Sequence, residues 1–536
     1  MMTQSRTSSI FIFLCFAVAI ISRSILFPDI PGGMNQDEAM SGYEAYALSL
    51  YGTDRFGTWL PAFFEGWGWT QLSVLQSYMS VPFIWIFGFS RFSARLPMLL
   101  VSIAGIYAVY AFTRNAFGRR AAIWVLFIAA ISPWHFMQSR WGLDCNPFPH
   151  FLMFAIFFLH KGLTQKKIYV YVSMLFFGLA MYGYGISFFT VPPFLFLLAL
   201  WLLTKRLLTF KEVLISILVY VIVALPILSV ILVNFFHIEG GVQAPWFTAQ
   251  FFPGNGRRGD LLLFTDKNVW LWLQESAHRL YGLIVLSWDD GPWNTTRVGS
   301  VYSWPSRYGD IPFSAPILAI GLIYMFLFKP KKEEGGDDTL RKASYIGKVL
   351  ALSWLVLAIY ASLMQQRPNI NNINIIHYPV IIVLGMGVAC IWQKIKLLAC
   401  ALVLAYAVSF GLFLQDYFTD HGKELSATFN AGLGEALQAA EASGADIIYS
   451  PEWDILTLFY LKIDPQYYQD KKTIVDKTGK ELIPYGDRYR GYGYDGIPEF
   501  NENAAIVLHN NRLHHFDTDL YEIWEGEGFS ALLPKK

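Results

Sequence analysis

The chain has 536 residues, of which 54% are hydrophobic and 17% aromatic, whereas only 15% are charged. This composition is too apolar for an ordinary soluble enzyme, and the chain is too long for a single domain. The formal net charge of +1 gives no sign of nucleic-acid binding. We therefore expect an integral membrane protein.

Apolar segments long enough to cross a membrane follow one another through the first 414 residues. Each crossing needs about 20 apolar residues. The candidate segments are residues 9–27, 94–113, 121–138, 148–163, 167–186, 188–204, 212–235, 311–329, 345–363, 375–392 and 397–414. They predict a multi-pass α-helical membrane domain with about 11 transmembrane helices over residues 1–414.

The basic residues predict the orientation of these helices, because short cytoplasmic loops are enriched in Lys and Arg. With the N-terminus in the cytoplasm, every second loop is basic, beginning with Arg114, Arg119 and Arg120 between the second and third segments. This orientation in the plasma membrane places a first outer loop at 28–93 and a second at 236–310 on the outer face.

Two parts of the outer loops are apolar without fitting the alternation of basic loops. Residues 71–89 resemble a span, but counting them as one would invert every later loop, so we predict an interfacial helix there. Residues 280–294 contain a second short apolar helix that breaks at Asp289 and Asp290. We expect this helix to be interfacial as well.

The last part of the chain, residues 415–536, has a different composition. It holds 32 charged side chains, 21 acidic and 11 basic. Residues 430–444 have a helical pattern, whereas 445–450 and 503–510 have the pattern of buried strands. We predict a small soluble α/β domain on the extracytoplasmic side.

An acidic pair, Asp37-Glu38, stands at the start of the first outer loop in NQDEAMSGYEAYAL. An ionised pair just beyond a membrane span is where an enzyme acting on lipid-borne substrates would keep a base. The alternative is a solvated helix start, because acidic residues favour helix N-termini.

Several stretches resemble the GT-C superfamily of polyprenyl-phosphate-dependent glycosyltransferases, in particular the family 39 protein mannosyltransferases and the lipid A aminoarabinose transferases. They are QDEAMSGYEA, GTDRFGTWLPAFFEGWGWTQL, FSRFSARLPMLLVSIAG, SPWHFMQSRWGLDCNPFPHF, MYGYGISFFTVPP and NIIHYPVIIVLGMGV. The aminoarabinose transferases have a KPP-type lysine motif in the first loop, where this chain reads PAFFEGWGWTQL. This departure argues against aminoarabinose transfer to lipid A.

The resemblance implies transfer of a sugar from a polyprenyl-phosphate donor to a hydroxyl of a protein, glycolipid or wall-polymer acceptor. Asp37 is then the candidate base, since a carboxylate within hydrogen-bond reach of the nucleophile can accept its proton. Glu38 could bind the acceptor, a neighbouring arginine or a divalent cation. The sequence shows no certain cofactor, and a divalent cation at Asp37 and Glu38 is the one left open.

The leaving phosphate requires positive charge, and arginine is a bidentate donor that stays protonated. The outer-side candidates are Arg55, Arg91, Arg95 and Arg140, and Asp144, close to Arg140 in sequence, is a further candidate for contact with the lipid phosphate or the sugar. The alternative is that these side chains are interface anchors with a salt-bridge partner, which for Arg140 could be Asp144.

His377 lies near the outer end of an apolar run, where an ionisable group is a functional candidate, although a buried structural imidazole is an equal alternative. Tyr43, Tyr182 and Tyr184 could line a sugar subsite, but aromatic belts give the same pattern.

Two other functions remain open from the sequence. The chain could be a lipid-linked sugar flippase or transporter, or a non-catalytic component of a cell-envelope polysaccharide export system. Against transport, no charged relay at mid-span and no broken helix pair in matching halves is evident.

Overall fold

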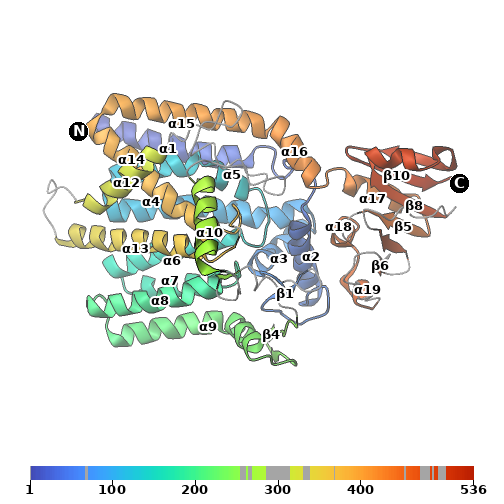
Figure 1. Cartoon of the computed structure of the whole chain (residues 1–536), viewed down its shortest axis with the longest axis horizontal. Coiled ribbons are helices and arrows are strands. Elements are labelled where there is room, and N and C mark those ends of the chain that lie inside the picture. Colours follow the sequence, from blue (N-terminus) through green and yellow to red (C-terminus); the bar gives the residue numbers. More distant parts are fainter. Residues whose placement is uncertain are drawn as a thin grey trace.

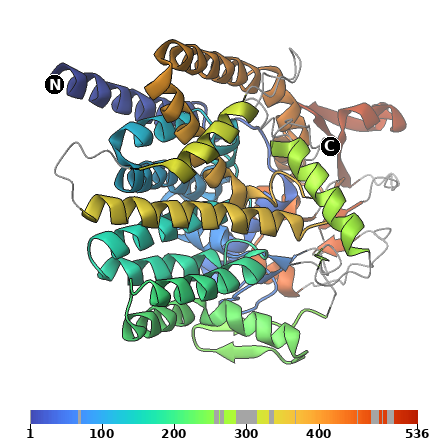
Figure 2. The same ribbon diagram turned by 60° about the vertical axis from the view of Figure 1, so that its left-hand side comes forward.

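The computed structural model describes residues 2–66, 71–253, 261–262, 268–284, 314–329, 338–366, 368–451, 454–470, 483–485, 488–492 and 503–535. Long helices lie side by side in one part of the molecule, and a sheet lies beyond one end of them (Figure 1). The N-terminus and the sheet stay on opposite sides when the molecule is turned by 60° (Figure 2).

The helical part extends from the N-terminus to Tyr417. Its helices are α1 (Met2–Ser24), α2 (Gln36–Tyr51), α3 (Leu75–Phe87), α4 (Arg91–Ala130), α5 (Pro133–Gln138), α6 (Pro147–Thr164), α7 (Ile168–Ala180), α8 (Ser187–Thr204), α9 (Phe210–Phe235), α10 (Val269–Ile284), α12 (Ala315–Leu327), α13 (Asp338–Leu363), η4 (Asn374–Ile376), α14 (His377–Lys394) and α15 (Lys396–Tyr417). Within the described residues, seven helices are long and apolar enough to cross a membrane: α1, α4, α8, α9, α13, α14 with the preceding η4, and α15. All predicted spans overlap helices, which confirms the predicted fold class.

The second and third predicted spans are joined in α4. Helix α4 consists of two helical stretches joined at Gly118, whose φ of 84° and ψ of 168° are not helical, so the chain bends there. The helix ends at Ala130 rather than continuing to residue 138. Pro133 has no N–H to continue the helix, and the Ser132 side chain caps α5 instead.

The outer loops contain helices that are too short to span the membrane. The predicted interfacial helix at 71–89 is observed as α3, whose 13 residues extend about 20 Å, less than the bilayer core of about 30 Å. Helices α2 and α10 run across the direction of the long helices (Figure 1). The predicted helix at 280–294 overlaps the end of α10, and its remainder lies outside the described residues.

Two short hairpins connect the outer loops. Strand β1 (Phe64–Glu65) pairs with β2 (Gln71–Leu72), and β3 (Val242–Ala244) pairs with β4 (Phe247–Ala249). The N–H of Ala62 donates to the Thr248 carbonyl (2.9 Å), and the N–H of Thr248 donates to the Leu60 carbonyl (3.0 Å). These hydrogen bonds hold the first outer loop against the second.

The C-terminal part has the predicted α/β character. It contains α16 (Asp420–Thr428), α17 (Leu433–Ala442), β5 (Ile447–Ser450), α18 (Asp454–Tyr460), α19 (Pro465–Asp470), β6 (Ile483–Tyr485), β7 (Tyr489–Gly491), β8 (Ala504–His509), η5 (Asn510–His515), η6 (Thr518–Leu520), β9 (Tyr521–Glu525) and β10 (Phe529–Pro534). The strand order is β6-β7-β5-β8-β10-β9, with β5 parallel to both β7 and β8. The predicted helix at 430–444 and the predicted strands at 445–450 and 503–510 correspond to α17, β5 and β8.

The C-terminal part shares a hydrophobic core with α2 and α3. The Phe459 ring of α18 packs edge to face against Phe89, with 4.7 Å between ring centroids. A Cβ atom at Gly42 of α2 would lie 2.8 Å from the same ring, so only glycine permits this approach. The Tyr43 hydroxyl donates to the Ile463 carbonyl at 2.8 Å. Helix α2 is therefore held on one face by the C-terminal part.

This shared core predicts the effect of truncating Phe459. The Phe459→Ala variant should lose about 3–5 kcal/mol of unfolding free energy, because a buried ring is removed and a cavity is left between α18 and α2. Thermal unfolding of the purified protein measures the loss, and Phe459→Leu, which keeps most of the apolar volume, is the control. Equal unfolding temperatures for wild type and Phe459→Ala would contradict the shared core.

Candidate functional site

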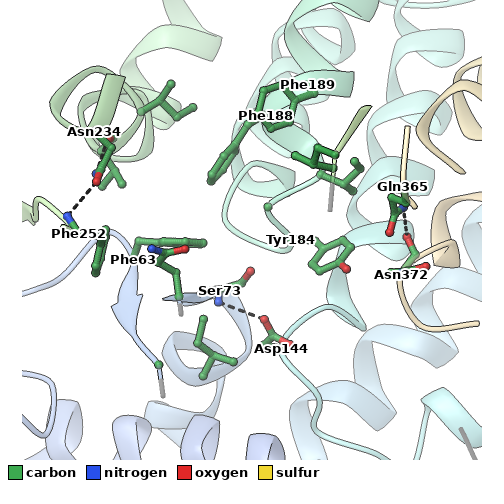
Figure 3. Close-up of a pocket in the computed structure, with 18 of the residues that line it drawn as sticks. Phe63, Ser73, Asp144, Tyr184, Phe188, Phe189, Asn234, Phe252, Gln365 and Asn372 are labelled. Carbon is green, nitrogen blue, oxygen red and sulfur yellow. Dashed lines mark hydrogen bonds between the residues drawn. The ribbon is translucent and has the colours of Figure 1, made fainter. Parts of the chain in front are cut away.

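A cavity of about 890 Å³ lies where the outer loops meet the ends of the long helices. Its described lining residues are Asp37, Phe63, Gly66, Gln71, Leu72, Ser73, Asp144, Tyr184, Gly185, Ile186, Phe188, Phe189, Val230, Ile231, Asn234, Phe235, His237, Phe252, Leu261, Gln365, Gln366, Asn369 and Asn372. Phe63, Phe252 and Asn234 lie on one side of the close-up, Gln365 and Asn372 on the other, and Phe188 and Asp144 between them (Figure 3). We call this cavity the outer pocket, after the segments predicted as outer loops that contribute to its lining.

Asp37 reaches the outer pocket from the first turn of α2. The Asn35 side chain caps this helix and accepts a hydrogen bond from the N–H of Asp37 at 3.0 Å. A carboxylate at this position also interacts favourably with the helix dipole. The helix-start interpretation and the pocket interpretation of Asp37 are therefore both compatible with its position.

Asp144 reaches the same pocket from the loop between α5 and α6. One of its oxygens accepts the Ser73 N–H at 3.1 Å (Figure 3). Burial raises the pKa of Asp144 to about 6, and the negative charge of Asp37 adds to this rise, whereas the Ser73 hydrogen bond opposes it. The outer pocket thus contains two carboxylates close enough to interact.

Glu38, the second member of the acidic pair, faces away from the pocket and forms a buried ion pair with Arg95. Nε and Nη2 of Arg95 donate to the two Glu38 carboxylate oxygens at 2.8 and 2.7 Å. The N–H of Gly142 donates to Glu38 Oε1 at 2.7 Å. Both side chains are fully buried. The geometry favours the arginine-partner role among the three that the sequence left open for Glu38.

The remaining N–H groups of Arg95 bind the turn before α2. Nη1 donates to the carbonyls of Pro28 (2.7 Å) and Pro31 (2.8 Å), and Nη2 also donates to Gly33 (3.0 Å). With the two bonds to Glu38, all five guanidinium donors are engaged. In this arrangement Arg95 positions the start of α2 and has no N–H left for a ligand.

The other predicted arginines also bind within the protein. Arg140 donates to the carbonyls of Arg23 (2.7 Å), Leu26 (2.9 Å) and Ile30 (3.0 Å), and not to Asp144. Arg91 forms an exposed ion pair with Asp29 at 3.0 Å.

Arg55 approaches the outer pocket more closely than these. It pairs with buried Glu44 at 2.6 Å, and its Nη2 donates to the carbonyl of Gly66 at 3.1 Å. Gly66 is a pocket-lining residue. Arg55 therefore supports the pocket wall through the backbone.

The predicted tyrosines and His377 occupy different environments. Tyr184 lines the pocket, whereas the Tyr43 hydroxyl donates to Ile463 and the Tyr182 hydroxyl donates to the Val223 carbonyl at 2.8 Å. His377 is buried at the start of α14 and stacks on Trp134, with 4.1 Å between ring centroids. Of the predicted site residues, Asp37, Asp144 and Tyr184 line the outer pocket.

Much of the pocket lining was not predicted from the sequence. Amide side chains form one part of it: Asn234, Gln365, Gln366, Asn369 and Asn372. The last four come from the connection between α13 and α14, where the sequence QQRPNINN is unusually rich in amides. That composition was a usable signal, because amides offer both donors and acceptors to a hydroxyl-rich ligand.

The described residues contain no group of three or more His, Cys, Asp or Glu side chains arranged to hold a metal ion. From the sequence, Asp37 and Glu38 were the residues predicted to bind a divalent cation. Because Glu38 is bound to Arg95 and Gly142, the pair of carboxylates that face one ligand volume is Asp37 and Asp144.

Comparison with known proteins supports the fold. Residues 73–232 match the family model described as dolichyl-phosphate-mannose-protein mannosyltransferase, and a search of curated proteins gives no match. The crystal structure of ArnT from Cupriavidus metallidurans in the apo state aligns with a TM-score of 0.55 and 12% identity, covering 99% of this chain and 98% of that chain. ArnT from the same organism bound to undecaprenyl phosphate gives a TM-score of 0.56 and 13% identity, covering 98% and 97%.

The predicted resemblance is thus confirmed at the level of fold, because the chain shares the fold of ArnT over nearly its full length.

The opposite environments of the two adjacent carboxylates predict different effects of neutralising them. Glu38→Gln should cost about 3–5 kcal/mol of unfolding free energy, because it leaves the Arg95 charge buried without its counter-ion. Asp37→Asn should cost about 1 kcal/mol or less, the scale of a charge at a helix start. Thermal unfolding of both purified variants provides the measurement. Equal destabilisation would contradict the division of roles.

Proposed function

We propose that the protein is an inverting glycosyltransferase that moves a monosaccharide from a polyprenyl-phosphate carrier to an acceptor hydroxyl at the outer face of the plasma membrane. The observation that carries this proposal is the presence of two carboxylates, Asp37 and Asp144, in one pocket that also has an apolar wall. The fold shared with ArnT, which has been crystallised with undecaprenyl phosphate, supports a lipid-phosphate donor.

The reaction is a direct displacement at the anomeric carbon of the donor sugar. The acceptor hydroxyl oxygen forms the new bond to this carbon, the bond from the carbon to the phosphate oxygen breaks, and its electron pair leaves with the polyprenyl phosphate. The hydroxyl proton passes to the Asp37 carboxylate, which acts as general base. Attack from the side opposite the leaving group inverts the configuration.

Asp144 supplies the second negative charge. With a pKa of about 6 it is mostly ionised at neutral pH. Positive charge develops on the sugar as the bond to phosphate breaks. A carboxylate fixed beside that charge stabilises the transition state more than the ground state. This role requires the ionised form of Asp144.

Different parts of the pocket wall suit different parts of the donor. Phe63, Phe188, Phe189, Val230, Ile231, Phe235 and Phe252 form the apolar part of the lining, which suits the first isoprene units. Tyr184 and the amides of Gln365 and Asn372 lie on the other side, where sugar hydroxyls would find donors and acceptors (Figure 3). Arg55 acts on this site as a positioning residue through Gly66.

A divalent cation fits this proposal at Asp37 and Asp144. Mg²⁺ is commonly bound by one or two carboxylates together with substrate phosphate and water, so two carboxylates are a sufficient protein contribution. Such an ion would offset the negative charge of the donor phosphate.

The test of the proposed function is sugar release from a panel of radiolabelled polyprenyl-phosphate monosaccharides by the purified protein. We expect turnover of one donor and a loss of at least about 100-fold in Asp37→Asn, since general base catalysis contributes about 10²–10⁴. Repeating the assay with a chelator and then added Mg²⁺ tests the cation.

Several outcomes would contradict the proposal. If no donor turns over, with acceptor extracts supplied and the protein shown to be folded, the enzyme assignment fails. If Asp37→Asn translocates labelled lipid across vesicles as well as wild type while neither protein releases sugar, the flippase alternative is favoured.

The pKa of Asp144 predicts a pH dependence. Because burial and Asp37 raise this pKa to about 6, the carboxylate becomes protonated as the pH falls through 6. The transfer rate should therefore fall below about pH 6 and reach a plateau above it. The rate–pH profile of Asp144→Asn, measured on its lower residual activity, should lack this limb. An unchanged limb in the variant would assign it to another group.

A further inference from the structure

A second, smaller cavity of about 240 Å³ lies between α4 and α6. Tyr107, Tyr110 and Arg114 come from one face of α4, because residues three, four and seven apart lie on the same side of a helix. Phe157, Lys161 and Gln165 come from one face of α6 and its end by the same spacing. We call this cavity the inner pocket.

The inner pocket lies at the membrane face opposite the outer pocket. Arg95 stands at the start of α4, beside the outer pocket residues, whereas Arg114 follows it along the same helix. At 1.5 Å per residue the two are about 28 Å apart, close to the thickness of the bilayer core. Asp144 precedes α6, and Lys161 lies in its last turn. Both helices therefore place the inner pocket at the other leaflet.

The inner pocket contains two positive charges without a negative partner. Neither Arg114 nor Lys161 forms an ion pair in the part of the chain that the structure describes. The Lys161 ammonium lies 4.0 Å from the centroid of the Tyr169 ring, which orients it without neutralising it. Two amides, Asn115 and Gln165, complete the polar lining.

The lining of the inner pocket includes a tyrosine at the protein surface. Tyr107 is 59% exposed, whereas Tyr110 is buried. Tyrosine is favoured at the headgroup level of a bilayer because it combines an apolar ring with a polar hydroxyl. A phosphate that carries acyl chains could therefore be bound by Arg114 and Lys161 while the chains lie against α4.

We propose that the inner pocket binds the phosphate of an anionic phospholipid from the leaflet opposite the outer pocket. Basic pockets between transmembrane helices on the cytoplasmic side are suited to such headgroups, and the basic loops of this chain predict that this face is cytoplasmic. The bound lipid would neutralise Arg114 and Lys161 and join α4 to α6. This inference is independent of the glycosyl transfer proposed for the outer pocket.

The test compares two double variants of the full chain. Arg114→Gln/Lys161→Gln removes the pocket charges, whereas Arg120→Gln/Lys166→Gln removes two exposed charges from neighbouring positions that do not line the pocket. Both double variants lose two positive charges. The affinity of each for an anionic lipid surface should therefore fall by the same factor, about fivefold per basic residue. Native mass spectrometry of the purified proteins, titrated with phosphatidylglycerol or phosphatidylcholine, measures retained lipid.

We expect wild type and the control variant to retain phosphatidylglycerol over phosphatidylcholine, and the pocket variant to bind it at least tenfold more weakly than the control. Equal loss in the two variants, or no loss in either, would overturn the proposal. If the pocket variant does not fold, wild type alone decides: a saturable rise in unfolding temperature with phosphatidylglycerol and none with phosphatidylcholine supports the site, and equal responses refute it.

A competition experiment with inorganic phosphate tests whether the inner pocket binds the phosphate of a lipid or free phosphate. If millimolar phosphate displaces phosphatidylglycerol from wild type and raises the unfolding temperature as much as the lipid does, the inner pocket is a site for free phosphate and the lipid proposal fails. Retention of the lipid in excess phosphate supports recognition of headgroup and chains together.

Discussion

The buried ion pair between Glu38 and Arg95 is the interaction on which the geometry of the outer pocket depends. Charged groups removed from water are tolerated only when paired and hydrogen bonded. Here each Glu38 oxygen accepts from Arg95, and Oε1 also accepts from Gly142. Asp37 directly precedes Glu38, and Asp144 follows Gly142 by two residues. One ion pair thus fixes the two chain segments that bring the pocket carboxylates together.

The C-terminal part contributes to the same geometry from the other side of α2. A soluble tail that only recognised acceptor could be removed without disturbing the membrane part. The contact of Phe459 with Gly42 and the hydrogen bond from Tyr43 to Ile463 instead join the two through a common core. Removal of the C-terminal part should therefore also disturb the position of α2, which carries Asp37.

The sequence predicted the helices better than the pocket. Hydropathy is local, so the long apolar helices, the short helix α3 and the elements α17, β5 and β8 could be recognised in single segments. The end of α4 was missed because the hydropathy continues past Pro133. The roles of the arginines could not be read, since their partners are backbone carbonyls such as those of Pro28, Pro31 and Gly66, which have no sequence signature.

The acidic pair shows where such prediction stops. Two adjacent carboxylates at a helix start look equivalent in sequence, yet successive side chains on a helix point in different directions. Only the position of Arg95 shows which one is structural. Asp144 was predicted as a binding residue or salt-bridge partner beside Arg140, and not as a second carboxylate facing Asp37. Its significance comes from sharing a pocket with Asp37, which is a property of the fold.

The charge of the outer pocket has a consequence for how the proposed donor would bind. Without a bound cation, the two carboxylates repel a lipid phosphate, so they do not themselves supply the affinity for the donor. The apolar wall can, through van der Waals packing against the isoprene units, which does not depend on charge. As the bond to phosphate breaks, positive charge appears on the sugar and the same carboxylates become attractive. In the ground state, packing of the polyprenyl chain offsets the repulsion between the carboxylates and the phosphate. In the transition state the carboxylates attract the positively charged sugar instead, so the transition state is stabilised more than the ground state and the reaction is faster.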